Sequence, residues 1–507
     1  MSLQSGSRLL SRGRTAIAQR VGVDVRALAA LRVSLALVLL ADLLLRSRNL
    51  VAFYTDAGTL PRSLLAASYP AFATYSLHAL SGDAWLQVAL FVVAGLLALS
   101  LLVGYRTKTT LFLSWLLLVS LHARNPYVLN GGDSLLRRLL FWGLFLPLGR
   151  RWSVDALRRG SVESVTVVTD RVPEPLVASV ASAALLVQVV LVYATNAVVK
   201  LRGDVWLDGT AILQVFSLDQ LTVFLGDILA NYPTLLRVFG ELWLLMVVTS
   251  PLLVLLTGRT RAGFAALFVG MHLGMLATMK LGIFPLVSVC GLLAFLPPVV
   301  WEPVERRVVD PVRRRTRVAR TGRTVDDLLP TMAFGGGARW TTLSDRVAPA
   351  VVSVLLVVVL LWNAASIGVV DTPEVVESNV DPGQFRWNMF APAPLNVDGW
   401  FVVPGRLDSG ERVDAFRGSD VDWEKPDEVD RTYPSARWRK YLQDVRWGGD
   451  TRLRRGFADY LCHRWNSDHE DELTSLTVGY VQQPTRLDGP EPTKRVELLE
   501  HQCPAGT

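Results

Sequence analysis

The chain has 507 residues, 51% of them hydrophobic, and its mean hydropathy is +0.33. That composition excludes an ordinary soluble protein and predicts a chain that crosses a membrane several times. The net charge of +7 does not indicate a nucleic-acid partner, because residues 371–507 hold 25 acidic and 17 basic side chains, a net of −8, which leaves +15 for the remainder.

The apolar segments predict a mostly α-helical domain with nine membrane-spanning helices. Residues 1–26 carry five arginines and one aspartate, lack a cleavage site and indicate a basic cytoplasmic tail. The predicted spans are 27–45, 84–103, 109–121, 135–148, 176–199, 239–256, 263–279, 286–300 and 347–370. Residues 210–230 mix apolar and polar side chains, which leaves a re-entrant or an interfacial segment as alternatives.

The arginine-rich loops set the predicted orientation. They all fall on one side of the nine spans, and such loops mark the cytoplasmic side. The most basic of them, residues 301–346, has ten arginines and separates the domain 27–300 from the last span, 347–370. We therefore expect a multi-pass protein of the cell membrane, partnered by the lipid bilayer, with a cytoplasmic N-terminus and an extracytoplasmic tail.

The tail, residues 371–507, predicts a small extracytoplasmic α+β domain of ordinary size. Its predicted elements are strands at 399–404, 411–416, 473–481 and 495–499 and helices at 435–447 and 452–465. A turn at 408–410 predicts that the first two strands form a hairpin. Cys462 and Cys503 are the only cysteines of the tail, and a disulfide or two buried thiols are the alternatives.

The segment 193–209 holds the strongest candidate for a functional site. Lys200, one of six lysines against 46 arginines, stands at the end of the fifth predicted span. An ionisable group at the edge of a membrane helix is costly, and burial can turn a lysine into a working base. The alternative is an anchor whose ammonium reaches the lipid headgroups. Asn196, Asp204 and Trp206 lie at or just past the same helix end.

Other polar groups carry weaker signals. Asp42 and Arg46 are four residues apart, so they either pair on one helix face or fix the helix end. The glycines of Asn130-Gly-Gly-Asp133 permit close approach of the backbone and also form ordinary turns. The chain has no Walker A, G-x-S-x-G, H-E-x-x-H or C-x-x-C motif, and its six histidines are too scattered to predict a metal site.

Four motifs occur in an order that resembles one membrane-protein family. They are Leu129-Asn-Gly-Gly-Asp133, Arg151-Trp-Ser-Val-Asp155, Lys200 with Trp206 and Gly209, and His272 with Gly282-Ile-Phe-Pro285. The set resembles the HTTM (horizontally transferred transmembrane) domain family, prokaryotic relatives of the membrane part of vitamin K-dependent gamma-carboxylase. The resemblance covers roughly residues 20–300. The tail is similar to the extracytoplasmic domain of one prokaryotic branch.

The resemblance implies a chemistry for Lys200. In the carboxylase the matching lysine deprotonates reduced vitamin K, the activated quinol reacts with oxygen, and the strong base so formed removes a proton from a glutamate before carbon dioxide adds. The implied cofactor is a reduced quinone, menaquinol or a vitamin K hydroquinone. The implied catalytic residues are Lys200 and His272, and the implied substrate-binding residues are Asn130, Asp133, Asn196, Asp204 and Trp206.

The chain also departs from the carboxylase. Asn130-Gly-Gly-Asp133 stands where the carboxylase has an Asn-Asn-His sequence, and the carboxylase's recognition domain for its protein substrate is missing. These departures bear on glutamate carboxylation more than on the quinol step. The sequence therefore leaves two functions open. One is a carboxylase-like lyase or oxidoreductase, and the other is a non-enzymatic membrane protein for maturation, export or binding of a secreted peptide or lipid.

Overall fold

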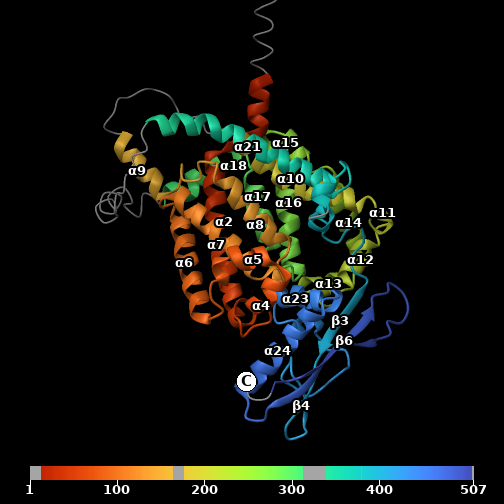
Figure 1. Cartoon of the computed structure of the whole chain (residues 1–507). Helices are drawn as coiled ribbons and strands as arrows, with labels where there is room; N and C mark the ends of the chain where they lie inside the picture. Colours follow the sequence, from red (N-terminus) through yellow and green to blue (C-terminus); the bar gives the residue numbers. More distant parts are fainter. Residues whose placement is uncertain (1–12, 164–175, 312–337, 378–379, 505–507) are drawn as a thin grey trace, which may run out of the picture.

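The computed structural model describes residues 13–163, 176–311, 338–377 and 380–504. A bundle of helices forms the upper part of Figure 1, and the C-terminal domain, drawn in blue, lies below it. Parts of the predicted tail 1–26 and of the predicted loop 301–346 fall outside the described residues, at 1–12 and 312–337. Residues 13–21 are helical, and the short strands β1 (Val23–Asp24) and β2 (Leu176–Val177) pair beside them.

The longer helices of the bundle are α2 (Val25–Ser47), α6 (Ala84–Val103), α7 (Thr107–Arg124), α8 (Gly131–Gly143), α9 (Val154–Glu163), α10 (Val180–Lys200), α14 (Pro233–Val248), α16 (Gly258–Thr278), α17 (Phe284–Leu293) and α21 (Ala338–Ser366). Short helices connect them: α3 (Leu50–Tyr54), α4 (Arg62–Ser68), α5 (Pro70–Tyr75), η1 (Leu77–Ala79), η2 (Pro126–Val128), α11 (Asp204–Leu207), α12 (Ala211–Phe216), α13 (Leu225–Leu229), α15 (Leu252–Leu255), α18 (Pro298–Val304), η3 (Glu305–Val309) and α22 (Glu374–Glu377).

Five of the described helices are long and apolar enough to cross a membrane: α2, α6, α10, α16 and residues 347–366 of α21. A sixth crossing results if α17 and the segment 298–309, which meet at 100°, count as one broken span. Helix α8 has 13 residues and α14 has 16, so at 1.5 Å per residue neither reaches the roughly 30 Å of a bilayer core. The nine crossings therefore stay a prediction, and the structure supports a multi-pass helical domain.

Helix α10 lies at the centre of the bundle. In the 18-residue apolar stretch of α10, 67% of the residues are buried. The corresponding share is 22% for α6 and for α16, and 11% for α21. It packs against α8, α14, α17 and α21. A helix that is apolar on nearly all sides is stable only when neighbours surround it. Its last residue is Lys200, so the fold carries that lysine into the protein interior.

Residues 210–230 form short helices rather than a span. The helices α12 and α13 pack with α14, and Leu213, Leu218 and Leu236 share a small apolar core there. Gln214, Asp219 and Asp227 interrupt the apolar run, which explains why no long helix forms.

The C-terminal domain is a five-stranded antiparallel sheet with two helices. Its strands are β3 (Val397–Val402), β4 (Pro404–Leu407), β5 (Arg412–Asp414), β6 (Leu473–Pro484) and β7 (Lys494–Gln502), and its longer helices are α23 (Ala436–Trp447) and α24 (Thr451–Asp468). Two 3-10 turns, η4 (Pro382–Phe385) and η5 (Val429–Thr432), precede them. Strand β6 is central: β3 and β4 pair with one edge and β7 with the other.

The predicted hairpin is present with a shifted first strand. The turn at 408–410 joins β4 to β5, while most of the predicted strand 399–404 is β3, which pairs with β6. Cys462 of α24 and Cys503, just past β7, form a disulfide. That bond joins a helix on the sheet to the last strand.

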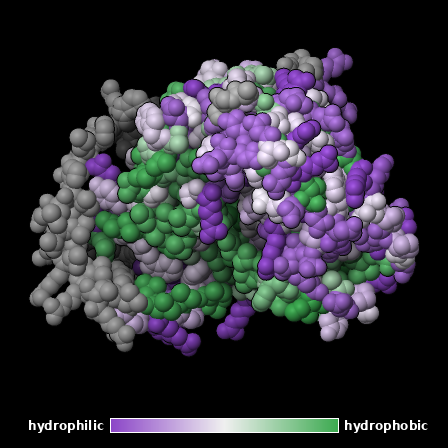
Figure 2. All heavy atoms as spheres, turned by 90° about the horizontal axis from the view of Figure 1, so that it is seen from below, coloured by the Kyte–Doolittle hydropathy of each residue, from purple (hydrophilic) through white to green (hydrophobic). Residues whose placement is uncertain are grey.

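The C-terminal domain shares a core with the helices above it. Phe53 of α3 lies against Trp438 and Tyr441 of α23, with ring centroids 4.6 and 5.9 Å apart. Seen from below, hydrophilic side chains cover the right of the molecule, where the domain lies, while a broad apolar surface stays open on the left (Figure 2). The domain is thus docked against one end of the bundle, and the apolar flank beside it faces outward.

Candidate functional site

Lys200 is buried at the end of α10. Only 1% of the residue is exposed, and its Nζ lies 2.7 Å from the ring centroid of Trp206. Among the described residues, no carboxylate lies within ion-pair distance of this ammonium. A buried amine that meets an aromatic face and no acid differs from a lysine anchor, whose charge stays in water.

A segment from the C-terminal region covers this helix end. We call residues 387–392 the cover segment. Asn196 Nδ2 donates to the carbonyl oxygens of Trp387 and Met389, at 3.2 and 3.0 Å, and Trp206 Nε1 donates to that of Phe390 at 2.8 Å. The cover segment belongs to the run RWNMFAP at residues 386–392, and nothing in that run indicates where it binds.

Gly203 lets the cover segment approach closely. A Cβ at this position would lie 2.3 Å from the Pro392 carbonyl oxygen, inside van der Waals contact. Asn196 and Trp206, both predicted to bind substrate, are therefore the residues that hold the cover segment over the Lys200 end of α10.

His272 lies in an aromatic cage on the same side of α10. The ring centroids of Tyr193, Trp243 and Phe284 are 5.8, 5.8 and 5.9 Å from that of the imidazole. Its Nδ1 is 2.8 Å from the Phe268 carbonyl oxygen, and its Nε2 has no partner among the described residues. Tyr193 precedes Lys200 by two helical turns, so both side chains belong to one face of α10.

Asn130 and Asp133 form the capping box of α8. Asn130 Oδ1 accepts from the backbone N–H of Gly132 at 2.8 Å, and the Asn130 N–H donates to Asp133 Oδ2 at 2.8 Å. A Cβ on Gly132 would lie 2.8 Å from the backbone of Phe284, which explains the glycine at this position, whereas a Cβ on Gly131 would make only ordinary contacts, the nearest at 3.7 Å. The loop therefore contacts the residue whose ring borders His272.

Asp204 stands apart from the other predicted residues. It begins α11, is exposed and makes no ion pair with a described residue. The structure brings Lys200, Trp206 and Asn196 together and places His272 along the same helix face, with Asn130 and Asp133 beyond Phe284.

A second cluster, which we call the charge cluster, joins the two domains. It consists of Asp42, Arg46, His122, Asp133 and Arg437, all buried. Arg46 binds Asp42 Oδ2 at 2.7 Å and also binds Asp133. Arg437 of α23 binds both carboxylates as well, with Asp133 at 3.0 Å. Burial disfavours the charge of Arg437, but Asp133 and Asp42 outweigh it and raise the pKa of this guanidinium.

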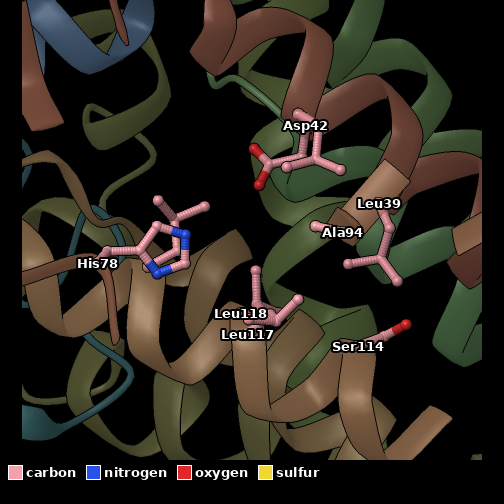
Figure 3. A pocket seen from close by; sticks show the side chains of 9 residues that line it. Leu39, Asp42, His78, Ala94, Ser114, Leu117 and Leu118 are labelled. Carbon is pink, nitrogen blue, oxygen red and sulfur yellow. The ribbon is translucent and has the colours of Figure 1, made fainter. Parts of the chain in front are cut away.

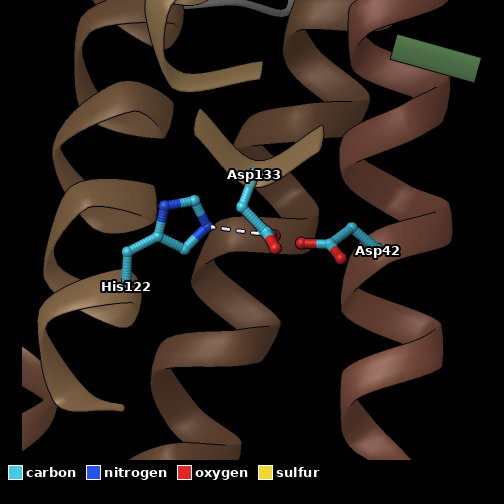
Figure 4. Close-up of side chains that lie close together, drawn as sticks. All are labelled: Asp42, His122 and Asp133. Atoms are coloured by element: carbon cyan, nitrogen blue, oxygen red, sulfur yellow. Dashed lines mark ion pairs between the residues drawn. The ribbon is translucent and has the colours of Figure 1, made fainter. Parts of the chain in front are cut away.

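Asp42, His122 and Asp133 have the donor types of a metal site and point toward one another in Figure 4. Their ligand atoms lie within 4.8 Å of one another. The two guanidiniums already neutralise both carboxylates, and Arg46 Nη2 lies 3.1 Å from His122 Nε2. A cation would have to displace both arginines, so the donor set fits an ion-pair network rather than a metal.

Beside the charge cluster lies a small apolar cavity, shown in Figure 3. Its volume is about 20 Å³, and Leu39, Leu118 and the side of Asp42 line it. That volume holds about one water molecule. It offers no room for a substrate.

The Trp-Ser-Val-Asp motif ties three helices together. Asp155 accepts from the backbone N–H groups of Arg106 and Thr107, at 2.9 and 2.8 Å, and so caps α7. Arg32 of α2 donates to the Trp152 carbonyl oxygen at 2.5 Å. These contacts give the motif a structural role at the end of the bundle away from the C-terminal domain.

Comparison with known families agrees with the motifs. The model of the HTTM domain matches residues 22–301, which are 280 of the 507 residues and include all four motifs. No curated protein and no solved structure matches the chain. The match confirms the family that the motifs indicate, and the apolar helices agree with it. The chain therefore belongs to the HTTM domain family and is a multi-pass membrane protein.

Proposed function

We propose that the Lys200 site acts on a reduced quinone, with Lys200 as the base. The observation that carries this proposal is the burial of Lys200, at 1% exposure, without a carboxylate partner among the described residues. An apolar surrounding favours the uncharged form of an amine, and that form accepts a proton. An ion-paired lysine would instead be held in its charged form.

The surrounding residues support an aromatic, lipid-soluble substrate. A bound reduced quinone supplies an acidic ring hydroxyl and two electrons. Trp206 offers a flat apolar surface beside the amine, and the aromatic cage of His272 continues along α10. In this proposal Lys200 Nζ accepts the hydroxyl proton, the cover segment excludes water, and oxygen takes the electrons.

We also propose that the C-terminal domain lies on the extracytoplasmic side of the cell membrane. Arg26 and Arg151 both lie near Glu305, and Arg261 donates to the backbone of Arg20, so these basic segments gather at one end of the bundle. The C-terminal domain contacts the other end, where Lys280 binds Asp430. Basic loops face the cytoplasm, which supports an external domain with a disulfide.

Oxygen uptake tests the proposal. The purified protein in nanodiscs receives a reduced naphthoquinol, and oxygen consumption is compared for the wild type, Lys200→Ala and Lys108→Ala. Lys108 is exposed at the start of α7 and serves as the control. A general base contributes roughly 10²–10⁴-fold, so we expect Lys200→Ala to lose at least about 100-fold and Lys108→Ala to keep the wild-type rate.

Lys200→Arg separates a base from an anchor. Arginine stays charged in proteins, so it serves as an anchor but cannot accept the proton. We expect Lys200→Arg to be as inactive as Lys200→Ala. Full activity of the arginine variant, or no uptake above background with several quinols in a folded wild type, would reject Lys200 as the base.

A second candidate function is the non-enzymatic handling of a secreted peptide. The observation that favours it is β7, a nine-residue strand that pairs with β6 and with no other described strand. An open strand edge can bind an extended peptide by main-chain hydrogen bonds. Val496→Pro in β7 and Lys200→Ala are compared for the phenotype that the wild-type protein gives to the cell. Loss of that phenotype in Val496→Pro, and its retention in Lys200→Ala, would favour this function.

A further inference from the structure

A larger cavity lies at the end of the bundle away from the C-terminal domain. Its volume is about 380 Å³, within the usual range for small-molecule pockets. Four parts of the chain line it: the stretch before α2, Leu176 of β2, Thr257 with the first turn of α16, and residues 294–299, which link α17 to α18 and begin α18. None of these belongs to the Lys200 site or to the charge cluster.

Arg261 is the polar side chain that marks this cavity. It lines the cavity and is only 3% exposed. Its Nη1 donates to the Arg20 carbonyl oxygen at 3.2 Å, while Nε and Nη2 have no partner among the described residues. A buried guanidinium with two unused donors is costly unless an anion accepts from them.

The start of α16 adds to the same preference. This helix has 21 residues, Thr257 makes no capping bond through its side chain, and its first turn has no acidic residue. The positive end of the helix dipole and its N–H groups therefore favour an anion. Asp24, which also lines the cavity, does not compete, because Arg26 binds its two oxygens at 3.0 and 2.8 Å.

Apart from Gln19, the rest of the wall is apolar, and it reaches the outer surface. Phe295, Leu296 and Val299 line it, and Val299 is 37% exposed. Nearby on α15, Leu255 is 55% exposed. An anion that carries an apolar chain fits this combination better than a small hydrophilic anion.

We propose that this cavity binds the phosphate group of an anionic phospholipid. Arg261 Nε and Nη2 donate to the phosphate oxygens, the first turn of α16 faces the same group, and the acyl chain runs out past Val299. The site is independent of the chemistry proposed for Lys200. It lies in the leaflet away from the C-terminal domain, among the arginine-bearing segments, where anionic headgroups are attracted.

Native mass spectrometry of the full chain in detergent tests this site. The probes are phosphatidylglycerol, phosphatidylcholine and inorganic phosphate, and the variants are Arg261→Gln and Arg259→Gln. Arg259 is exposed on the same turn, so its variant makes the same change of charge at the membrane surface. Losing a charged hydrogen bond weakens binding roughly tenfold or more. We therefore expect the affinity for phosphatidylglycerol to fall by that factor in Arg261→Gln and by less than about twofold in Arg259→Gln.

Val299→Trp fills the cavity and leaves its charge unchanged, and it gives the same test if Arg261→Gln does not fold. We expect Val299→Trp to prevent the binding of phosphatidylglycerol. Equal binding by the wild type and either cavity variant would overturn the proposal, as would an equal loss in Arg259→Gln. Binding of inorganic phosphate that displaces the lipid and depends on Arg261 would assign the site to free phosphate and overturn the lipid.

Discussion

Asp398 shows how a single buried side chain links the C-terminal domain to the helical bundle. It lies in β3, is 1% exposed, and accepts from the backbone N–H groups of Asp219 and Gln220 at 2.8 and 3.3 Å. Burial, followed by the charge of Asp219, raises the pKa of Asp398 to about 6. Its carboxylate thus titrates within a range that a stability measurement can cover.

The raised pKa of Asp398 predicts how stability changes with pH. The folded chain holds this proton more tightly than the unfolded chain, whose carboxyl has a pKa of about 4, so stability falls as pH rises from about 4 to about 6. The loss is about 3 kcal/mol. We expect Asp398→Asn to remove this slope from the melting temperature between pH 4 and pH 7. The exposed Asp420→Asn is the control, and an unchanged slope in Asp398→Asn would contradict the assignment.

A single residue can be singled out from the sequence where its chemistry is rare in its surroundings. Lys200 stood out because a lysine at the end of an apolar helix is costly, and the structure buries it. The partner of Asn196 could not be predicted, since it binds backbone carbonyls of residues 387 and 389, about 190 positions away. Backbone acceptors carry no sequence signature. For the same reason, the unused donors of Arg261 are visible only in the structure.

At the scale of elements, helix α23 connects the C-terminal domain to the helical bundle. Arg437 in its first turn enters the charge cluster, and Trp438 packs on Phe53. The sequence predicted this helix within one residue of its start, because Ser435 and the tryptophan-rich run are local signals. It did not predict the partners, since Asp42 and Asp133 precede Arg437 by 395 and 304 residues.

Arg437→Met tests that docking. It leaves two buried carboxylates with Arg46 as their remaining guanidinium, and breaking such a pair costs about 3–5 kcal/mol. We expect a lower melting temperature in detergent and partial recovery when Asp42→Asn is added. The exposed Arg455→Met should stay within about 0.5 kcal/mol of the wild type. An unaffected melting temperature for Arg437→Met would show that the cluster does not hold the domains together.

At the scale of the whole molecule, the two ends of the bundle differ in what they carry. One end has the basic segments and the lipid cavity, and the other has the C-terminal domain. The positive-inside pattern predicts this separation from sequence alone. Counting the spans from sequence was harder, because α8 and α14 are short helices that their neighbours bury in part.

Cysteine labelling in intact cells tests the orientation. Ser409→Cys places a thiol on the exposed β4–β5 turn, and Arg259→Cys places one at the opposite end. Cys290 is buried and the other two native cysteines are bonded, so their background is low. We expect a membrane-impermeant maleimide to label Ser409→Cys at once and Arg259→Cys only after permeabilisation. The reverse pattern would place the C-terminal domain in the cytoplasm.

The route of Arg437 into the charge cluster also has a consequence in time. A ribosome adds about 5–20 residues per second. Arg437 is therefore synthesised about 15–60 s after Asp133, which precedes it by 304 residues. During that wait the growing chain holds two acids beside Arg46 alone. A chain that terminates before residue 437 never receives the missing charge. Unfinished copies therefore differ from finished ones inside the membrane domain itself, where two buried acids share a single arginine of the cluster.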